Sequence, residues 1–149
     1  MSKELFVALA FLAGVAITFQ SGINAELNTL TRNPVVSTLI SFLAGTLLLV
    51  LIISVTTPGG FKQMPVPNAS NWWKFIGGFL GALYVCTVIV TFPKLGAATT
   101  LSLIIAGQLV SAVVFDHYGF LGFAVKTINI YRVIGILMII GGVLLVRRF

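Results

Sequence analysis

The feature that most limits the fold of this chain is an uncharged apolar run over residues 96–115. The run contains no Asp, Glu, Lys or Arg. At about 20 residues it matches the length that an α-helix needs to cross ~30 Å of hydrocarbon. Small residues recur on one face at helical spacing: Gly96, Thr100, Gly107 and Ser111. Because small residues let helices approach closely in a membrane, this run is predicted to be a spanning helix that lines a protein interior.

The composition indicates that the whole chain is embedded in a membrane. Hydrophobic residues make up 58% of the chain and charged residues only 8%, whereas about a quarter of the residues in a soluble domain are charged. The formal net charge of +6 favours loops beside anionic lipid headgroups. No basic run with interleaved aromatic residues predicts a nucleic-acid partner. We expect one all-α integral membrane domain over residues 1–149, surrounded by the lipid bilayer.

Five stretches of the chain are long and apolar enough to be spans. They are predicted at residues 5–27, 34–55, 73–92, 96–115 and 130–146. Asn33-Pro34 marks the first turn, because proline is favoured at the first position of a helix. Pro93-Lys94 is predicted to turn tightly into the fourth span. Arg132, near the start of the fifth span, is expected to snorkel outward to the interface.

Polar side chains on the first and fourth spans are the candidates for a binding site. They are Gln20, Asn24, Thr100, Gln108 and Ser111. A side-chain amide in hydrocarbon is costly without a partner, so the three amides should face protein or a wet cavity. For the hydroxyl groups, a hydrogen bond to a carbonyl one turn back is the simpler explanation. For the amides, ligand binding and interhelical hydrogen bonds of ~1 kcal/mol each both stay open.

Residue patterns for catalysis or metal binding are lacking in the sequence. The acidic residues are Glu4, Glu26 and Asp116, and none lies at the middle of a span. No nucleophile–base pair, cluster of metal ligands, phosphate loop or dinucleotide motif occurs, so we expect neither an enzyme nor a cofactor. His117 beside Asp116 is either a hydrogen-bonded interfacial residue or a proton-handling one. Cys86, in an apolar segment, is predicted to be a buried structural thiol.

Two long segments of the chain resemble a known family. They are WWKFIGGFLGALYVCTVIVTFPKLGAATTLSLIIAGQLVSAVVFDHYGFLG and INIYRVIGILMIIGGVLLV, of which GQL and DHYG are the most specific parts. Gln20 and Asn24 before Asn33-Pro34 fit the same pattern. The sequence is similar to the YdcZ family of five-helix bacterial inner-membrane proteins, which is related in architecture to the drug/metabolite transporter superfamily. The resemblance implies an antiparallel dimer, either with itself or with a paired homologue, in which two five-helix units form a ten-helix transporter.

The function that this resemblance implies is small-molecule transport by alternating access, in which two inverted units expose a midplane cavity to each side in turn. An ion channel built as an antiparallel dimer and a non-transporting membrane assembly subunit are the alternatives. In the more remotely similar small multidrug resistance proteins, a membrane-embedded glutamate binds cation and proton, and it falls at Gly14 here. The substrate is therefore expected to be neutral or zwitterionic. Asp116, His117 and Glu26 are the candidates for ion coupling.

Two further features concern how copies of the chain assemble. Gly135 and Gly142 fall on one face of the fifth span, which favours a close helix contact between two copies. The Lys and Arg residues divide almost evenly between the two sides of the membrane. With five spans, one side has Lys3, Lys62, Lys74, Lys126 and Arg132, and the other has Arg32, Lys94, Arg147 and Arg148. Because topology follows the Lys and Arg bias of short loops, we predict that the chain inserts in both orientations.

Overall fold

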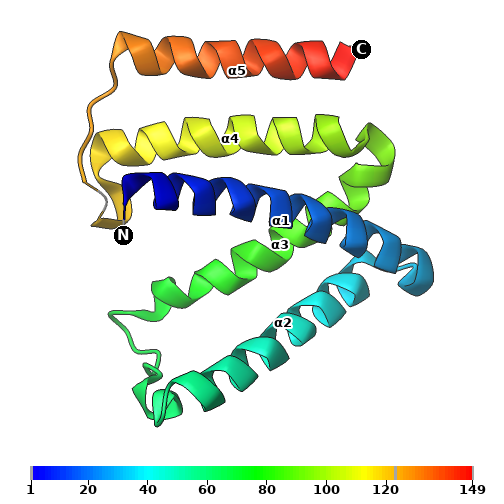
Figure 1. Cartoon of the computed structure of the whole chain (residues 1–149), viewed down its shortest axis with the longest axis vertical. Helices are drawn as coiled ribbons and strands as arrows, with labels where there is room; N and C mark the ends of the chain where they lie inside the picture. Colours follow the sequence, from blue (N-terminus) through cyan, green and yellow to red (C-terminus); the bar gives the residue numbers. More distant parts are fainter. Residues whose placement is uncertain (1, 123, 149) are drawn as a thin grey trace. The chain divides into compact units, whose positions relative to one another are not determined.

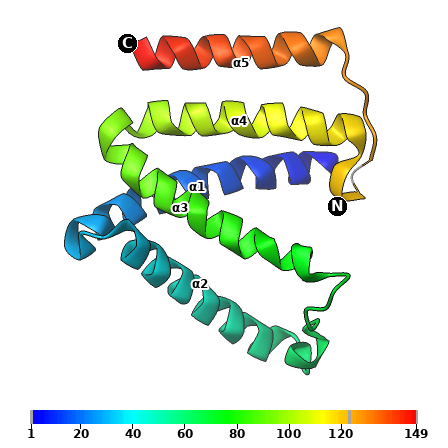
Figure 2. The same cartoon turned by 180° about the vertical axis from the view of Figure 1, so that it is seen from behind.

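The computed structural model of the chain describes residues 2–122 and 124–148, and the regular secondary structure of these residues is all helical (Figures 1 and 2). The long helices are α1 (Lys3–Thr31), α2 (Pro34–Thr56), α3 (Ile76–Leu95), α4 (Ala97–Tyr118) and α5 (Ile130–Arg148). Short 3₁₀ turns are η1 (Gly60–Gln63), η2 (Trp72–Phe75) and η3 (Phe120–Gly122). With η2 joined to α3, the described residues contain 5 helices long and apolar enough to span a membrane. The predicted all-helical, five-span class is confirmed.

The turn between α1 and α2 forms where the sequence predicts it. Asn33 caps α2, because its Oδ1 accepts from the N–H groups of Val35 at 2.9 Å and Val36 at 3.3 Å, and Pro34 takes the first helical position. α1 reaches Thr31, about one turn beyond the predicted end. It stops there because Arg32 adopts a left-handed conformation (φ 53°).

The turn between α3 and α4 lies slightly later in the sequence than the predicted position, Pro93-Lys94. α3 continues through Pro93 to Leu95, and the chain turns at Gly96, whose φ is +81°. Proline in the last turn of a helix removes only one backbone hydrogen bond. A positive φ costs glycine little, whereas it strains other residues. The glycine, rather than the proline, therefore ends α3.

The chain divides into two compact units, one reaching Pro93 and the other beginning at Lys94. In the first unit, α1 and α2 diverge from their turn, and a loop with η1 and η2 leads back into α3 (Figure 1). In the second unit, α4 and α5 pack side by side (Figures 1 and 2). The buried apolar side chains among the described residues are Val85, Val88, Ile89 and Val143. The single-domain organisation stays a prediction.

A cluster of polar side chains pins the first turn. Ser37 on α2 is 0% exposed, and its hydroxyl lies 2.6 Å from the Thr31 hydroxyl and 3.3 Å from Asn28 Oδ1 on α1. The same hydroxyl lies 3.1 Å from the Asn33 carbonyl oxygen. These contacts hold the end of α1 against the start of α2, because buried polar groups are costly once they lose a partner.

We expect Ser37→Ala to lower the free energy of unfolding by ~1 kcal/mol, because it removes the hydrogen bonds that the buried Ser37 hydroxyl makes to the end of α1. Ser54→Ala is the matched control on the same helix. Ser54 is exposed and donates only to the Val50 carbonyl at 2.8 Å. Thermal unfolding of both variants in detergent measures the difference. Equal melting temperatures for the two variants would show that the cluster adds no stability.

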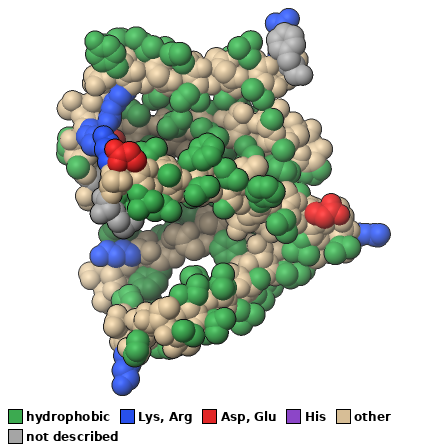
Figure 3. All heavy atoms as spheres, viewed as in Figure 1, with side chains coloured by type: hydrophobic (Ala, Val, Ile, Leu, Met, Phe, Trp, Pro, Cys, Tyr) green, Lys and Arg blue, Asp and Glu red, His purple; other side chains and the backbone are tan. Residues whose placement is uncertain are grey.

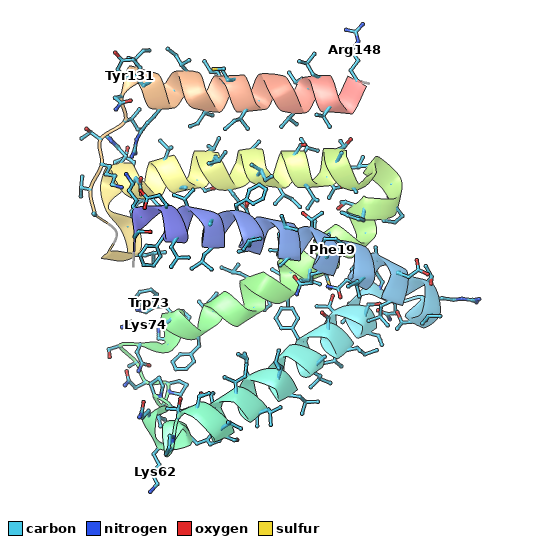
Figure 4. All side chains as sticks on the ribbon, viewed as in Figure 1. Phe19, Lys62, Trp73, Lys74, Tyr131 and Arg148 are labelled. Atoms are coloured by element: carbon cyan, nitrogen blue, oxygen red, sulfur yellow. The ribbon has the colours of Figure 1, made fainter. Side chains whose placement is uncertain are left out.

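Charged side chains lie toward the helix ends on the face shown in Figure 3, and apolar side chains cover the flanks of the helices. At the start of α3, Lys74 Nζ lies 5.6 Å from the centre of the Trp73 ring, and Lys62 lies in the same connecting region (Figure 4). Trp and Tyr are enriched at both membrane interfaces. Trp72 and Trp73 are therefore expected to lie at a membrane interface.

Candidate functional site

On α1, the predicted binding residues Gln20 and Asn24 have different environments. Gln20 is exposed, whereas Asn24 is only 4% exposed. The neighbouring Ser21 hydroxyl donates to the Ile17 carbonyl at 2.7 Å and is therefore satisfied within its own helix. The Asn24 side chain has no hydrogen-bond partner among the described residues. Asn24 therefore lies among packed groups with its amide donor and acceptor unused, which makes it the stronger candidate of the two.

On α4, the predicted binding residues Gln108 and Ser111 lie together in a shallow hollow of about 520 Å³. The hollow is also lined by Leu103, Ile104, Gly107, Ala112 and Phe115. Both polar side chains are exposed, and within residues 2–122 and 124–148 neither has a hydrogen-bond partner. Gln108 can offer a donor and an acceptor, and Ser111 a hydroxyl that does both. The hollow can therefore hydrogen-bond an uncharged polar group.

Thr100, near the start of α4, is the third predicted residue on this helix. It is 3% exposed, and its buried Oγ1 has no partner in the described part of the chain. The expectation that the hydroxyls of Thr100 and Ser111 bond a carbonyl one turn back is wrong for both residues. Other hydroxyls in the spans, those of Thr46 and Thr87, do make that bond. Both side chains therefore have hydrogen-bonding capacity left for another group.

The binding residues fall into two sets that belong to different units. Gln20 and Asn24 lie on α1 in the first unit, and Thr100, Gln108 and Ser111 lie on α4 in the second. Within each set, the residues are close because they lie on the same helix. That the two sets form one site stays a prediction.

Asp116 and Arg132 form an ion pair in the second unit, with Arg132 Nη1 3.2 Å from Asp116 Oδ2. Both side chains are half-buried, at 28% exposed for Arg132 and 33% for Asp116. The expectation that Arg132 snorkels freely outward is therefore wrong. The loop after α4 brings the start of α5 back to the end of α4, and this places the two charges side by side.

The other residues predicted for ion coupling and assembly are placed as follows. His117 Nδ1 accepts from the Ile128 N–H at 3.2 Å, so His117 lies beside the ion pair. Glu26 is exposed on α1, in the other unit.

A Cβ at Gly135 or Gly142 would meet no atom of the described chain within 4 Å, so this face of α5 has room for another helix. Among the described residues, no group of three or more His, Cys, Asp or Glu side chains could hold a metal ion.

Sequence reasoning missed an apolar groove of about 440 Å³ between α2 and α3. Its lining residues are Val35, Thr38, Leu39, Phe42, Phe79, Ala82, Leu83 and Cys86. The Cys86 thiol lies 3.1 Å from the Thr38 hydroxyl, and Cys86 is half-buried rather than buried. Apolar residues on two separate helices carry no sequence signal that they face each other, so the groove emerges only from the packing.

The family model described as "Putative inner membrane exporter, YdcZ" matches residues 5–145. The chain belongs to the YdcZ family. A curated relative, "Inner membrane protein YdcZ" of Escherichia coli (strain K12), is 26% identical over 149 residues. The alignment covers 99% of each of the two chains. No solved structure matches the chain. The predicted resemblance is confirmed.

Membership of the YdcZ family, together with the five spanning helices, makes this chain a multi-pass inner-membrane protein. The most specific YdcZ-like segments, GQL and DHYG, lie on α4 and at its end, where they contain Gln108, Asp116 and His117. The exporter description of the YdcZ family agrees with the expectation that the chain is not an enzyme.

Proposed function

We propose that this YdcZ-family protein is a small-molecule transporter that works by alternating access as an antiparallel dimer of five-helix chains. The observation that carries the proposal is the pair of unpartnered polar side chains, Gln108 and Ser111, in the hollow of a predominantly apolar span. Polar groups at this depth are costly unless they face protein or a water-filled cavity. The family description favours export as the direction.

In the proposed dimer, a second copy shields from lipid the polar side chains that are exposed in one chain. Gln20, Gln108 and Ser111 are all exposed, although they lie within membrane-spanning helices. An amide left against acyl chains would lose its hydrogen bonds to water without replacement. Facing copies of α1 and α4 around a shared cavity remove this penalty, and the even Lys and Arg distribution favours an inverted pair. A paired homologue could take the place of the second copy.

The substrate class follows from the chemistry of the candidate residues. The acidic residues of the chain are Glu4, Glu26 and Asp116, and Asp116 is already paired with Arg132. Amide groups can orient a ligand through hydrogen bonds, but they cannot neutralise a full charge in a low dielectric. We therefore propose a neutral or zwitterionic substrate, held by Asn24 and Gln108 with help from the neighbouring hydroxyl groups.

The experiment that tests the proposal has two steps. Thermal-shift measurements of the purified protein against a set of neutral and zwitterionic metabolites identify a stabilising ligand. Flux of that ligand is then measured in liposomes as molecules per dimer per second. A saturable, slow flux supports alternating access, whereas conduction many orders of magnitude faster would indicate a channel. Absence of both stabilisation and flux would overturn the transporter proposal in favour of an assembly subunit.

The dimer contact gives a separate prediction. Gly142→Leu should weaken the dimer in detergent, because it fills the open face of α5 where the partner backbone approaches. Gly141→Leu adds the same side chain one position away, on another face of the same helix, and should leave the dimer intact. Light scattering of both variants over a dilution series measures the change in dissociation constant. A dimer that survives Gly142→Leu and Gly135→Leu would place the contact elsewhere.

A further inference from the structure

The segment that leads into α5 is tied to the last turn of α4 by backbone and side-chain hydrogen bonds. The Lys126 N–H donates to the Asp116 carbonyl at 2.8 Å. Arg132 Nη1 donates to the Lys126 carbonyl at 3.3 Å and to Asp116 Oδ2 at 3.2 Å. We call residues 126–128 the strap, because α4 holds them on one side and α5 holds them on the other.

One hydrogen bond of the strap forms only while the His117 side chain is neutral. The Ile128 N–H donates to His117 Nδ1 at 3.2 Å. A backbone N–H can only donate, so Nδ1 must carry a lone pair, and the ring proton of the neutral imidazole is on Nε2. When a proton binds Nδ1, this nitrogen becomes a donor that faces another donor, and the hydrogen bond is lost.

We propose that the strap is pH-sensitive and that protonation of His117 at Nδ1 detaches Ile128 from the end of α4. Within the second unit, the charged and titratable groups around His117 are Asp116 and Tyr118 on α4, Lys126 in the strap and Arg132 on α5.

The charges around His117 favour release once the proton has bound. Arg132 already neutralises Asp116, so the new positive charge on His117 finds no unpaired carboxylate in Asp116. The strap is therefore closed while His117 is neutral, at the higher pH, and opens when His117 gains a proton at lower pH.

Strap opening can be measured without any substrate, so its test is independent of the transport proposal. Amide hydrogen exchange of the full chain in lipid nanodiscs is followed for the peptide that contains Ile128, at pH 5 and pH 8, with correction for intrinsic exchange rates. We expect the unaltered protein to lose roughly fivefold in protection at pH 5, the change that one hydrogen bond of ordinary strength produces.

Two variants at position 117 serve as matched controls. His117→Asn places a carbonyl oxygen near the position of Nδ1 and cannot be protonated in this range, so protection should be high at both pH values. His117→Phe keeps the ring shape without an acceptor, so protection should be low at both. Equal protection of the unaltered protein at pH 5 and pH 8, or full protection in His117→Phe, would overturn the proposal.

A measurement on the unaltered protein covers the case in which the variants fail to fold. Nitrogen-15 NMR of the imidazole gives the protonation of Nδ1, and the Ile128 amide signal gives its hydrogen bond. Both should titrate together. An Ile128 amide signal that stays constant while Nδ1 gains its proton would show that the strap does not respond to His117.

Discussion

Replacing Gln108 by Leu is expected to reduce transport to background in liposomes while leaving expression and dimer formation unchanged. Gln108 lies in the hollow of α4 beside Ser111, and no described residue satisfies its amide. Loss of a buried hydrogen bond to the substrate costs ~1–3 kcal/mol, which is a loss of affinity of roughly 5- to 150-fold. The change also replaces a polar group by one that acyl chains solvate well, so the helix should insert at least as readily.

Gln63→Leu is the control for this experiment, because Gln63 is exposed in η1, outside the spans. Asn24→Leu is the companion variant, since Asn24 is the buried and unpartnered amide of α1. Initial rates of uptake of the ligand found by thermal shift are compared for all three. If Gln108→Leu transports like the unaltered protein, the amide of α4 serves packing and the binding site lies elsewhere.

The second large effect concerns orientation, since about half of the molecules are expected to insert each way. The two sides of the five-span topology have Lys and Arg residues in a ratio of five (Lys3, Lys62, Lys74, Lys126 and Arg132) to four (Arg32, Lys94, Arg147 and Arg148). A difference of one is almost no bias under the rule that short-loop cations set topology. The pairing of Arg132 with Asp116 does not alter the count, because acidic residues contribute little to topology.

A cysteine appended after Phe149 in a Cys86→Ala background reports orientation when sealed cells are labelled from outside. Labelling of about half of the protein is the expected result. Adding two lysines to the loop between α2 and α3, through Gln63→Lys and Asn68→Lys, should drive most molecules into one orientation and reduce active dimer. All-or-none labelling of the unaltered chain would indicate a fixed orientation and favour a heterodimer with an oppositely biased partner.

The sequence predicts the number of spans because hydropathy and the cost of unsatisfied backbone groups in lipid leave few alternatives. Helix ends are less certain where short-range signals compete. Asn33-Pro34 is a cap and a first-turn proline together and is predicted correctly, whereas the α3–α4 boundary depends on the positive φ of Gly96 rather than on Pro93.

The contacts of single side chains depend on packing that periodicity does not contain. Gln20 and Asn24 are equivalent in the sequence pattern, yet one is exposed and the other is buried. Arg132 meets Asp116 only because the intervening loop folds back, and a hydropathy plot carries no information about that return. The polar residues of the candidate site could therefore be predicted, but their individual environments could not.

The odd number of spans has a consequence for how such a protein can evolve. A chain with five spanning helices starts on one side of the membrane and ends on the other. If its gene is duplicated and the copies are joined head to tail, the second half starts where the first half ended and is inverted without any added helix. A chain with four or six spans would need an extra helix for the same result. If the proposed inverted homodimer forms, a single fusion event can thus turn it into one ten-helix polypeptide, whose two halves are then free to diverge.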